Sequence, residues 1–167
     1  MQAVIFCGIQ ASGKSTFYKE HFFNTHVRIS LDLLRTRNRE NLLLEACLST
    51  QMRFVVDNTN PTAAERQKYI GLAKAARYEV VGYFFETSVK EALVRNSRRS
   101  GRFVVPDKGV FGTLKRLQKP ALAEGFDVLY LVRLQQDGSY IIKQVEPETG
   151  HRFPDSADGP DGSEPEV

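Results

Sequence analysis

The chain has 167 residues, of which 41% are hydrophobic and 26% charged, values that fit one globular domain and exclude a wholly disordered or collagen-like chain. It contains no apolar run of about 18 residues and no basic leader before its first apolar segment, so we expect a cytoplasmic protein without a membrane span. Cys7 and Cys47 are too few for a disulfide framework and too far apart for a zinc motif.

Charge divides the chain into two parts. Residues 1–145 carry 22 Lys and Arg against 13 Asp and Glu, a net charge of +9, whereas residues 146–167 carry one Arg against seven acids, a net charge of −6. A basic body suits a polyanionic partner such as nucleic acid. The acidic segment is rich in Pro and Gly, so we expect a folded domain over 1–145 and a disordered tail over 146–167.

Short apolar runs alternate with longer segments of helical periodicity along the body. Continuous apolar runs are typical of parallel strands that are buried on both faces. The expected strands are 4–6, 27–30, 54–56, 80–85 and 128–132, and the expected helices are 14–23, 32–50, 62–76, 88–100 and 107–118. This order predicts a three-layer α/β domain with a mostly parallel sheet.

Local signals refine this outline at three points. Residues 60–61, Asn-Pro, predict an N-cap followed by Pro at the first helical position. Ser88 and Glu91 form the pattern of a capping box at the start of a helix. The turn sequence 136–139 predicts a hairpin that adds residues 140–142 as an antiparallel edge strand.

The segment after the first expected strand carries the strongest chemical signal. Residues 8–15 satisfy the pattern G-x-x-x-x-G-K-[ST] between a strand and a helix, which predicts a P-loop for ATP or another NTP. Lys14 is expected to contact the outer phosphates, and the Ser15 hydroxyl to coordinate Mg²⁺ or Mn²⁺. The expected nucleotide-binding residues of this segment are Gly8, Ser12, Gly13, Lys14, Ser15 and Thr16.

Asp32 and Arg35 follow the second expected strand, three residues apart on one face of the expected helix. Ligands of open α/β sheets bind at this carboxyl edge, where a carboxylate can take the proton of an attacking hydroxyl and an arginine can hold a phosphate. The same spacing also fits a capping Asp in an exposed ion pair.

Asp57 follows the third expected strand. An acid in this position beside a P-loop is expected to orient the metal shell or the acceptor, as a Walker B carboxylate does. A simple Asx turn into the next helix is the alternative interpretation.

Four arginines are spaced i, i+3, i+4 and i+7 near the end of the fourth expected helix: Arg95, Arg98, Arg99 and Arg102. We expect them to line one face of that helix and its exit. Like charges this close repel each other unless an anion screens them, so the pattern predicts a helical arginine lid over a transferring phosphate. A solvated basic face is the alternative.

Together these motifs resemble the kinase module of polynucleotide 5′-hydroxyl kinases. The resemblance rests on residues 8–15, the Asp32-x-x-Arg35 pair, residues 57–61 and residues 95–106, and it extends over about residues 2–133. It implies a P-loop kinase that transfers the γ-phosphate of an NTP to the 5′-hydroxyl end of RNA or DNA during repair.

The resemblance also implies roles for single residues. Asp32 matches the general base, Arg35 the residue that holds an acceptor phosphate, and Asp57 an acid of the acceptor site. Arg99 matches the lid arginine, with Arg95 as its neighbour at the donor. The implied catalytic residues are Asp32, Lys14 and Arg99.

Other acceptors and partners stay open at this stage. The same loop, acid and arginines would serve a P-loop kinase that phosphorylates a small molecule or an aminoacyl-tRNA, and a nucleotide-binding switch without activity would explain the loop alone. The sequence holds no DxDxT phosphatase motif, so the chain is either a free-standing kinase or a module of a longer protein, and we expect any phosphatase, phosphoesterase or ligase that completes end repair to come from outside residues 1–167.

Overall fold

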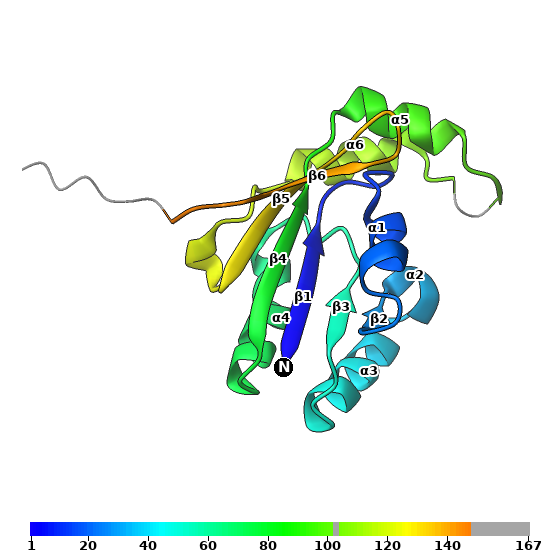
Figure 1. The fold of residues 1–167 in the computed structure, drawn as a ribbon. Helices are drawn as coiled ribbons and strands as arrows, with labels where there is room; N and C mark the ends of the chain where they lie inside the picture. Colours follow the sequence, from blue (N-terminus) through cyan, green and yellow to red (C-terminus); the bar gives the residue numbers. More distant parts are fainter. Residues whose placement is uncertain (102–103, 148–167) are drawn as a thin grey trace, which may run out of the picture.

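The computed structural model describes residues 1–101 and 104–147, which form one α/β domain around a six-stranded sheet. The strand order is β2-β3-β1-β4-β5-β6 (Figure 1). The strands are β1 Gln2–Cys7, β2 Val27–Ile29, β3 Phe54–Val56, β4 Glu79–Phe85, β5 Val128–Leu134 and β6 Tyr140–Gln144. The first five are parallel, and β6 pairs antiparallel to β5, which confirms the predicted hairpin.

Helices cover both faces of this sheet, as expected for a three-layer domain. Those among the described residues are α1 Lys14–His21, α2 Leu31–Leu34, α3 Arg37–Ser49, α4 Ala63–Ala75, α5 Val89–Ser97 and α6 Asp107–Arg116, with a 3-10 turn η2 Leu122–Glu124. None of the helices in the described part of the chain has the length and hydropathy needed to cross a bilayer. The expected acidic tail lies, from residue 148 onward, outside the described residues.

Two apolar clusters lie on opposite faces of the sheet. On one face, Leu44 of α3 and Tyr69 of α4 pack with strand residues that include Ile5. On the other face, α1 contributes Phe17 to a cluster around Phe6. Helices α5 and α6 instead lie beyond the carboxyl ends of the strands, at the top of Figure 1. This arrangement leaves the carboxyl edge of the sheet between α1, α2 and α5.

The single helix expected over 32–50 is wrong, because the chain forms two helices there. Arg35 ends α2 with a left-handed φ of 70°, and the Thr36 side chain then accepts a hydrogen bond from the Arg39 N–H to cap α3. Asp32 and Arg35 therefore do not share the face of a long helix. Asp32 lies in the first turn of the one-turn helix α2, and Arg35 is its C-cap.

The cap expected at residues 60–61 is also wrong, although the helix expected over 62–76 forms as α4 with nearly the same bounds. Helix α4 begins at Ala63, because Thr62 and Glu65 form a capping box that supplies a better N-terminus. Asn60 instead takes a φ of 42° and donates its Nδ2 to the Phe6 carbonyl at 2.8 Å. The capping box predicted at Ser88 is confirmed at the start of α5.

Candidate nucleotide and acceptor site

The P-loop is the turn that connects β1 to α1. Gly8 adopts a φ of 151°, and a Cβ at this position would lie 2.8 Å from the Phe85 carbonyl oxygen. Gly13, with a φ of 97°, is the N-cap of α1. The Gly8 N–H donates to the Thr59 carbonyl at 3.0 Å, which ties the loop to the segment after β3. The loop therefore presents the N-terminus of α1 to the carboxyl edge of the sheet, where backbone N–H groups favour phosphate.

Lys14 lies inside the curl of this loop and is 8% exposed. Its Nζ donates to the Gly8 carbonyl at 2.9 Å, the Ile9 carbonyl at 2.5 Å and the Ser12 Oγ at 3.1 Å. Burial lowers the pKa of Lys14 to about 8, and the nearby charge of Asp57 opposes this shift. The loop thus holds the ammonium group where it can contact the outer phosphates of a nucleotide.

Ser15 and Asp57 meet beside the loop. The Ser15 Oγ donates to Asp57 Oδ2 at 3.0 Å, which brings together a hydroxyl and a carboxylate of the kind that Mg²⁺ prefers. Kinase sites typically hold this ion by one or two protein ligands together with phosphate oxygens and water, so these two residues fit it. Within residues 1–101 and 104–147, no cluster of three or more His, Cys, Asp or Glu side chains offers another metal site.

Arg28 of β2 contacts both groups, and no local pattern in the sequence predicts these contacts. Its Nε and Nη2 donate to Asp57 Oδ2 at 2.8 and 2.6 Å, and Nη2 also donates to Ser15 Oγ at 2.9 Å. The guanidinium lies 5.5 Å from the centre of the Tyr18 ring. In the sequence, Arg28 stands out only as a charged residue within a short strand, Val27–Ile29.

A cavity of about 390 Å³ joins the loop to the acidic residues that follow β2 and β3. It is lined by residues 10–16, Leu31, Asp32, residues 57–59, Arg99 and Val105. Asp32 reaches it from α2, whose first N–H, that of Leu31, donates to Asn58 Oδ1 at 2.9 Å. The structure therefore brings Asp32, Asp57, Arg99 and the P-loop residues Ser12 to Thr16 to one volume.

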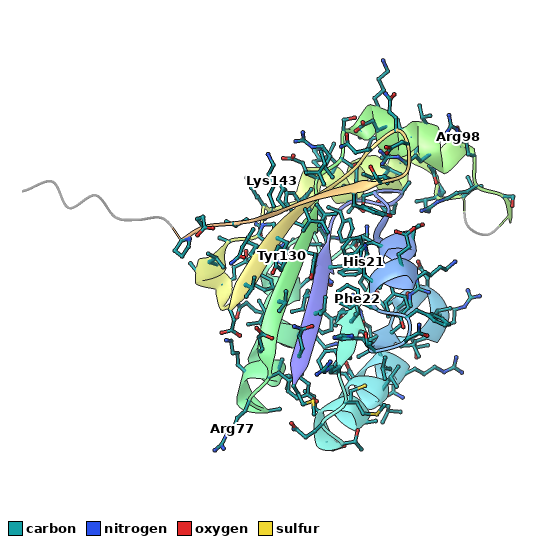
Figure 2. The ribbon with its side chains drawn as sticks, in the orientation of Figure 1. His21, Phe22, Arg77, Arg98, Tyr130 and Lys143 are labelled. Atoms are coloured by element: carbon teal, nitrogen blue, oxygen red, sulfur yellow. The ribbon has the colours of Figure 1, made fainter. Side chains whose placement is uncertain are left out.

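The arginines expected on one helix face are distributed differently, so that part of the prediction is wrong. Helix α5 ends at Ser97, and the Asn96 side chain hydrogen bonds to both the N–H and the carbonyl of Val105, which holds Val105 against the end of the helix. Arg98 is the helix C-cap and lies at the outer end of α5 in Figure 2, whereas Arg99 lines the cavity. Arg102 lies outside the described residues.

Three other candidate residues do not line the cavity. Arg95 donates from Nη1 to the Ala11 carbonyl at 3.2 Å and thereby contacts the P-loop from α5. Gly8 supports the loop through its backbone. Arg35 is exposed at the C-terminal end of α2, outside the cavity lining.

The strand order, the loop and its position at the sheet edge define a P-loop kinase domain. The chain belongs to the family AAA_33, described as an AAA domain, whose model matches residues 4–120.

Two curated relatives share similarity with part of the chain. A bifunctional polynucleotide phosphatase/kinase of Schizosaccharomyces pombe is 26% identical over 129 residues, which cover 75% of this chain and 32% of that protein. A bifunctional polynucleotide phosphatase/kinase of Acanthamoeba polyphaga mimivirus is 35% identical over 81 residues, which cover 48% of this chain and 19% of that protein. The chain thus spans about a third or less of these relatives, and the similarity confirms the family resemblance that the motifs predicted.

Solved structures share the fold at low sequence identity. A chain of the PezAT toxin-antitoxin system of Streptococcus pneumoniae has a TM-score of 0.61 at 16% identity and covers 84% of this chain and 70% of that chain. Kti12 of Chaetomium thermophilum, in complex with ADP-AlF3, has a TM-score of 0.61 at 16% identity and covers 81% of this chain and 92% of that chain. A gluconokinase from Sinorhizobium meliloti 1021 has a TM-score of 0.57 at 17% identity, with coverages of 78% and 81%. These likenesses confirm the predicted α/β P-loop fold.

Proposed function

We propose that this domain transfers the γ-phosphate of ATP or another NTP to the 5′-hydroxyl end of RNA or DNA, as part of nucleic-acid end repair. The observation that carries the proposal is the shared cavity, in which Asp32 faces the same volume as the P-loop and Arg99. Two further observations support a polynucleotide acceptor. The curated relatives carry this activity in their names, and residues 1–145 have a net charge of +9.

In the proposed reaction, Asp32 orients the 5′-hydroxyl and accepts its proton. The hydroxyl oxygen bonds to the γ-phosphorus while the bond to the β-phosphate oxygen breaks, and a nucleoside diphosphate leaves. Lys14, Arg99 and the backbone N–H groups of the loop stabilise the charge that moves onto the transferred group and the leaving oxygen.

The remaining residues bind and orient the two substrates. Ser15, with Asp57 beside it, would hold Mg²⁺ or Mn²⁺, which when bound neutralises phosphate charge. Arg35 would hold a phosphate of the acceptor at the outer end of α2. Arg95 would support the donor side through its contact with the loop.

The decisive experiment combines the protein, Mg²⁺, γ-labelled ATP and a short oligonucleotide with a 5′-hydroxyl end. The wild type should place the label on the 5′ end. Asp32→Asn should lower turnover by at least about 100-fold, because it removes the proton acceptor and keeps the shape of the side chain. Asp107→Asn, a matched exposed carboxylate on α6, should leave turnover unchanged.

Each outcome separates one reading from another. If Asp32→Asn transfers the label as fast as the wild type, Asp32 is not the base. ATP binding without label on the oligonucleotide contradicts the polynucleotide acceptor. The same assay would then be run with small hydroxyl compounds and with aminoacyl-tRNA, the other acceptors that the site fits.

A further inference from the structure

Glu40 is a buried carboxylate of α3 that the proposed reaction does not use. It is 0% exposed and accepts hydrogen bonds from four side chains. Asn58 Nδ2 and the Tyr69 hydroxyl donate to its Oε1 at 2.7 and 2.8 Å. Arg37 Nη1 and Lys68 Nζ donate to its Oε2 at 2.9 and 3.1 Å. Both carboxylate oxygens are therefore fully engaged.

The Asn58 side chain connects this carboxylate to the acceptor side of the cavity. Its amide nitrogen donates to Glu40, and its amide oxygen accepts from the Leu31 N–H at 2.9 Å. An ionised carboxylate can only accept hydrogen bonds, so Glu40 fixes which end of the Asn58 amide faces it. The amide oxygen is then left pointing at Leu31.

Helix α2 is supported by this contact at its start, whereas Leu34 at its other end packs against the core. The helix contains one turn, Leu31–Leu34, which is too short to be stable alone. Its N-cap Ser30 makes no capping hydrogen bond with its side chain. Asn58, from the segment after β3, therefore supplies the acceptor that caps the helix at Leu31. Leu31 directly precedes Asp32, the proposed base.

Burying the Glu40 carboxylate costs free energy of desolvation. Taking a charge out of water costs several kcal/mol, and even a well-paired buried charge often adds no net stability compared with apolar residues. We therefore expect Glu40 to matter chiefly for the geometry that it imposes on its neighbours.

We propose that Glu40 is a positioning residue that acts through Asn58 to hold α2, and with it Asp32, in line with the nucleotide. Its effect on turnover rests on the proposed kinase function, whereas its effect on α2 does not. Glu40 lies outside the lining of the cavity, so it does not touch the substrates itself.

The test compares Glu40→Gln, Asn58→Ala and the double variant with Glu45→Gln, which removes an exposed carboxylate from the same helix. Glu40→Gln and Asn58→Ala should each lower kcat by about tenfold or more while the KM for ATP stays within about twofold. The double variant should be no slower than the slower single variant, because both changes break one chain of contacts. Glu45→Gln should match the wild type.

Three kinetic outcomes would overturn the proposal. A folded Glu40→Gln protein with wild-type kcat removes the role of Glu40. Loss of kcat in Asn58→Ala alone shows that Asn58 acts directly on the substrates. Losses that multiply in the double variant show that the two residues act independently.

Amide hydrogen exchange distinguishes failure of this proposal from failure of the proposed polynucleotide function. Absence of label on an oligonucleotide in the wild type contradicts the polynucleotide acceptor alone. In either case, Glu40→Gln should speed exchange of the amides of residues 31–35 by about tenfold through local opening, whereas β1, whose amides open by global unfolding, should change only as far as the free energy of unfolding falls. Equal exchange of α2 in Glu40→Gln and the wild type would overturn the positioning role, because a purely global loss of stability speeds β1 and not the locally opening α2.

Discussion

Tyr140, the first residue of β6, contacts the P-loop. Its hydroxyl donates to the Gly13 carbonyl at 3.0 Å, and that carbonyl also accepts the Phe17 N–H at 2.9 Å. A Cβ on Gly13 would lie 3.1 Å from both the Leu134 Cδ2 and the Tyr140 hydroxyl. The hairpin thus packs closely on the loop, so a side chain at Gly13 would push the hairpin aside by a few tenths of an ångström and would also be strained by the φ of 97°.

Replacing Tyr140 by Phe should weaken nucleotide binding without unfolding the domain. The change removes one hydrogen bond of about 1 kcal/mol, so the Kd for ATP should rise about fivefold in titration calorimetry. The effect is moderate because Phe17 still holds the same carbonyl. Tyr130→Phe, on the neighbouring strand, is the control and should bind ATP like the wild type. An unchanged Kd in Tyr140→Phe would contradict the idea that β6 supports the loop.

At the scale of single elements, sequence patterns place the strands and the P-loop well and fail where backbone conformation is unusual. The first strand and the loop after it were predictable, because a buried apolar run followed by a fixed glycine spacing leaves few alternatives. The break at Arg35 was not, because a left-handed residue other than glycine is uncommon and leaves no local pattern. Asp32 lies at the carboxyl edge of the sheet, as expected, but on the one-turn helix α2 and not on a long helix over 32–50.

The Glu40 cluster shows a second limit of local patterns. Its members come from α3, α4 and the segment after β3, and only the folded sheet brings them together. In the sequence, Glu40 has the spacing of an ordinary exposed ion pair with Arg37, whereas in the structure it is fully buried. Arg28 was missed for the same reason, since its partners Ser15 and Asp57 lie on other elements.

Glu40 should make the stability of this cluster depend on pH. Burial alone raises the pKa of a carboxyl, but the side-chain hydrogen bonds lower the pKa of Glu40 below its ordinary value of 4.5. A carboxyl with a lowered pKa stabilises the fold fully above about pH 4.5 and loses this contribution as the pH falls through its folded pKa. Arg37 and the Tyr69 hydroxyl, whose pKa values are both raised, stay protonated throughout this range.

The measurement is the free energy of urea unfolding of the wild type and of Glu40→Gln at several pH values. Glu40→Gln should be less stable by about 2 kcal/mol at pH 7, and the difference should shrink below pH 4.5. Glu45→Gln supplies the control, with a small difference at every pH. A difference between wild type and Glu40→Gln that stays constant from pH 7 to pH 3 would contradict a charged Glu40 in the folded state.

At the scale of the whole molecule, the cavity lies at the edge of the sheet where the carboxyl ends of the parallel strands meet. The P-loop after β1, Asp32 after β2 and Asp57 after β3 meet there because all three strands run in the same direction. The segment after α5 then adds Arg99 to the lining of the cavity. Arg77 lies far from this edge, beyond the amino ends of the strands in Figure 2. The positive charge near the cavity can therefore be tested separately from the net charge of the domain.

Affinity for a single-stranded oligonucleotide should fall steeply with salt if phosphates bind at this edge, since each neutralised phosphate adds about 0.7 to the slope of log K against log salt. Arg35→Ala should reduce that slope by about 0.7, because it removes the phosphate contact that we propose at the end of α2. Arg77→Ala removes the same charge from the distant end and should leave the slope unchanged. Fluorescence anisotropy at several salt concentrations measures both. Equal slopes for Arg35→Ala and Arg77→Ala would mean that the acceptor is held by net charge alone, and the proposed role of Arg35 would be wrong.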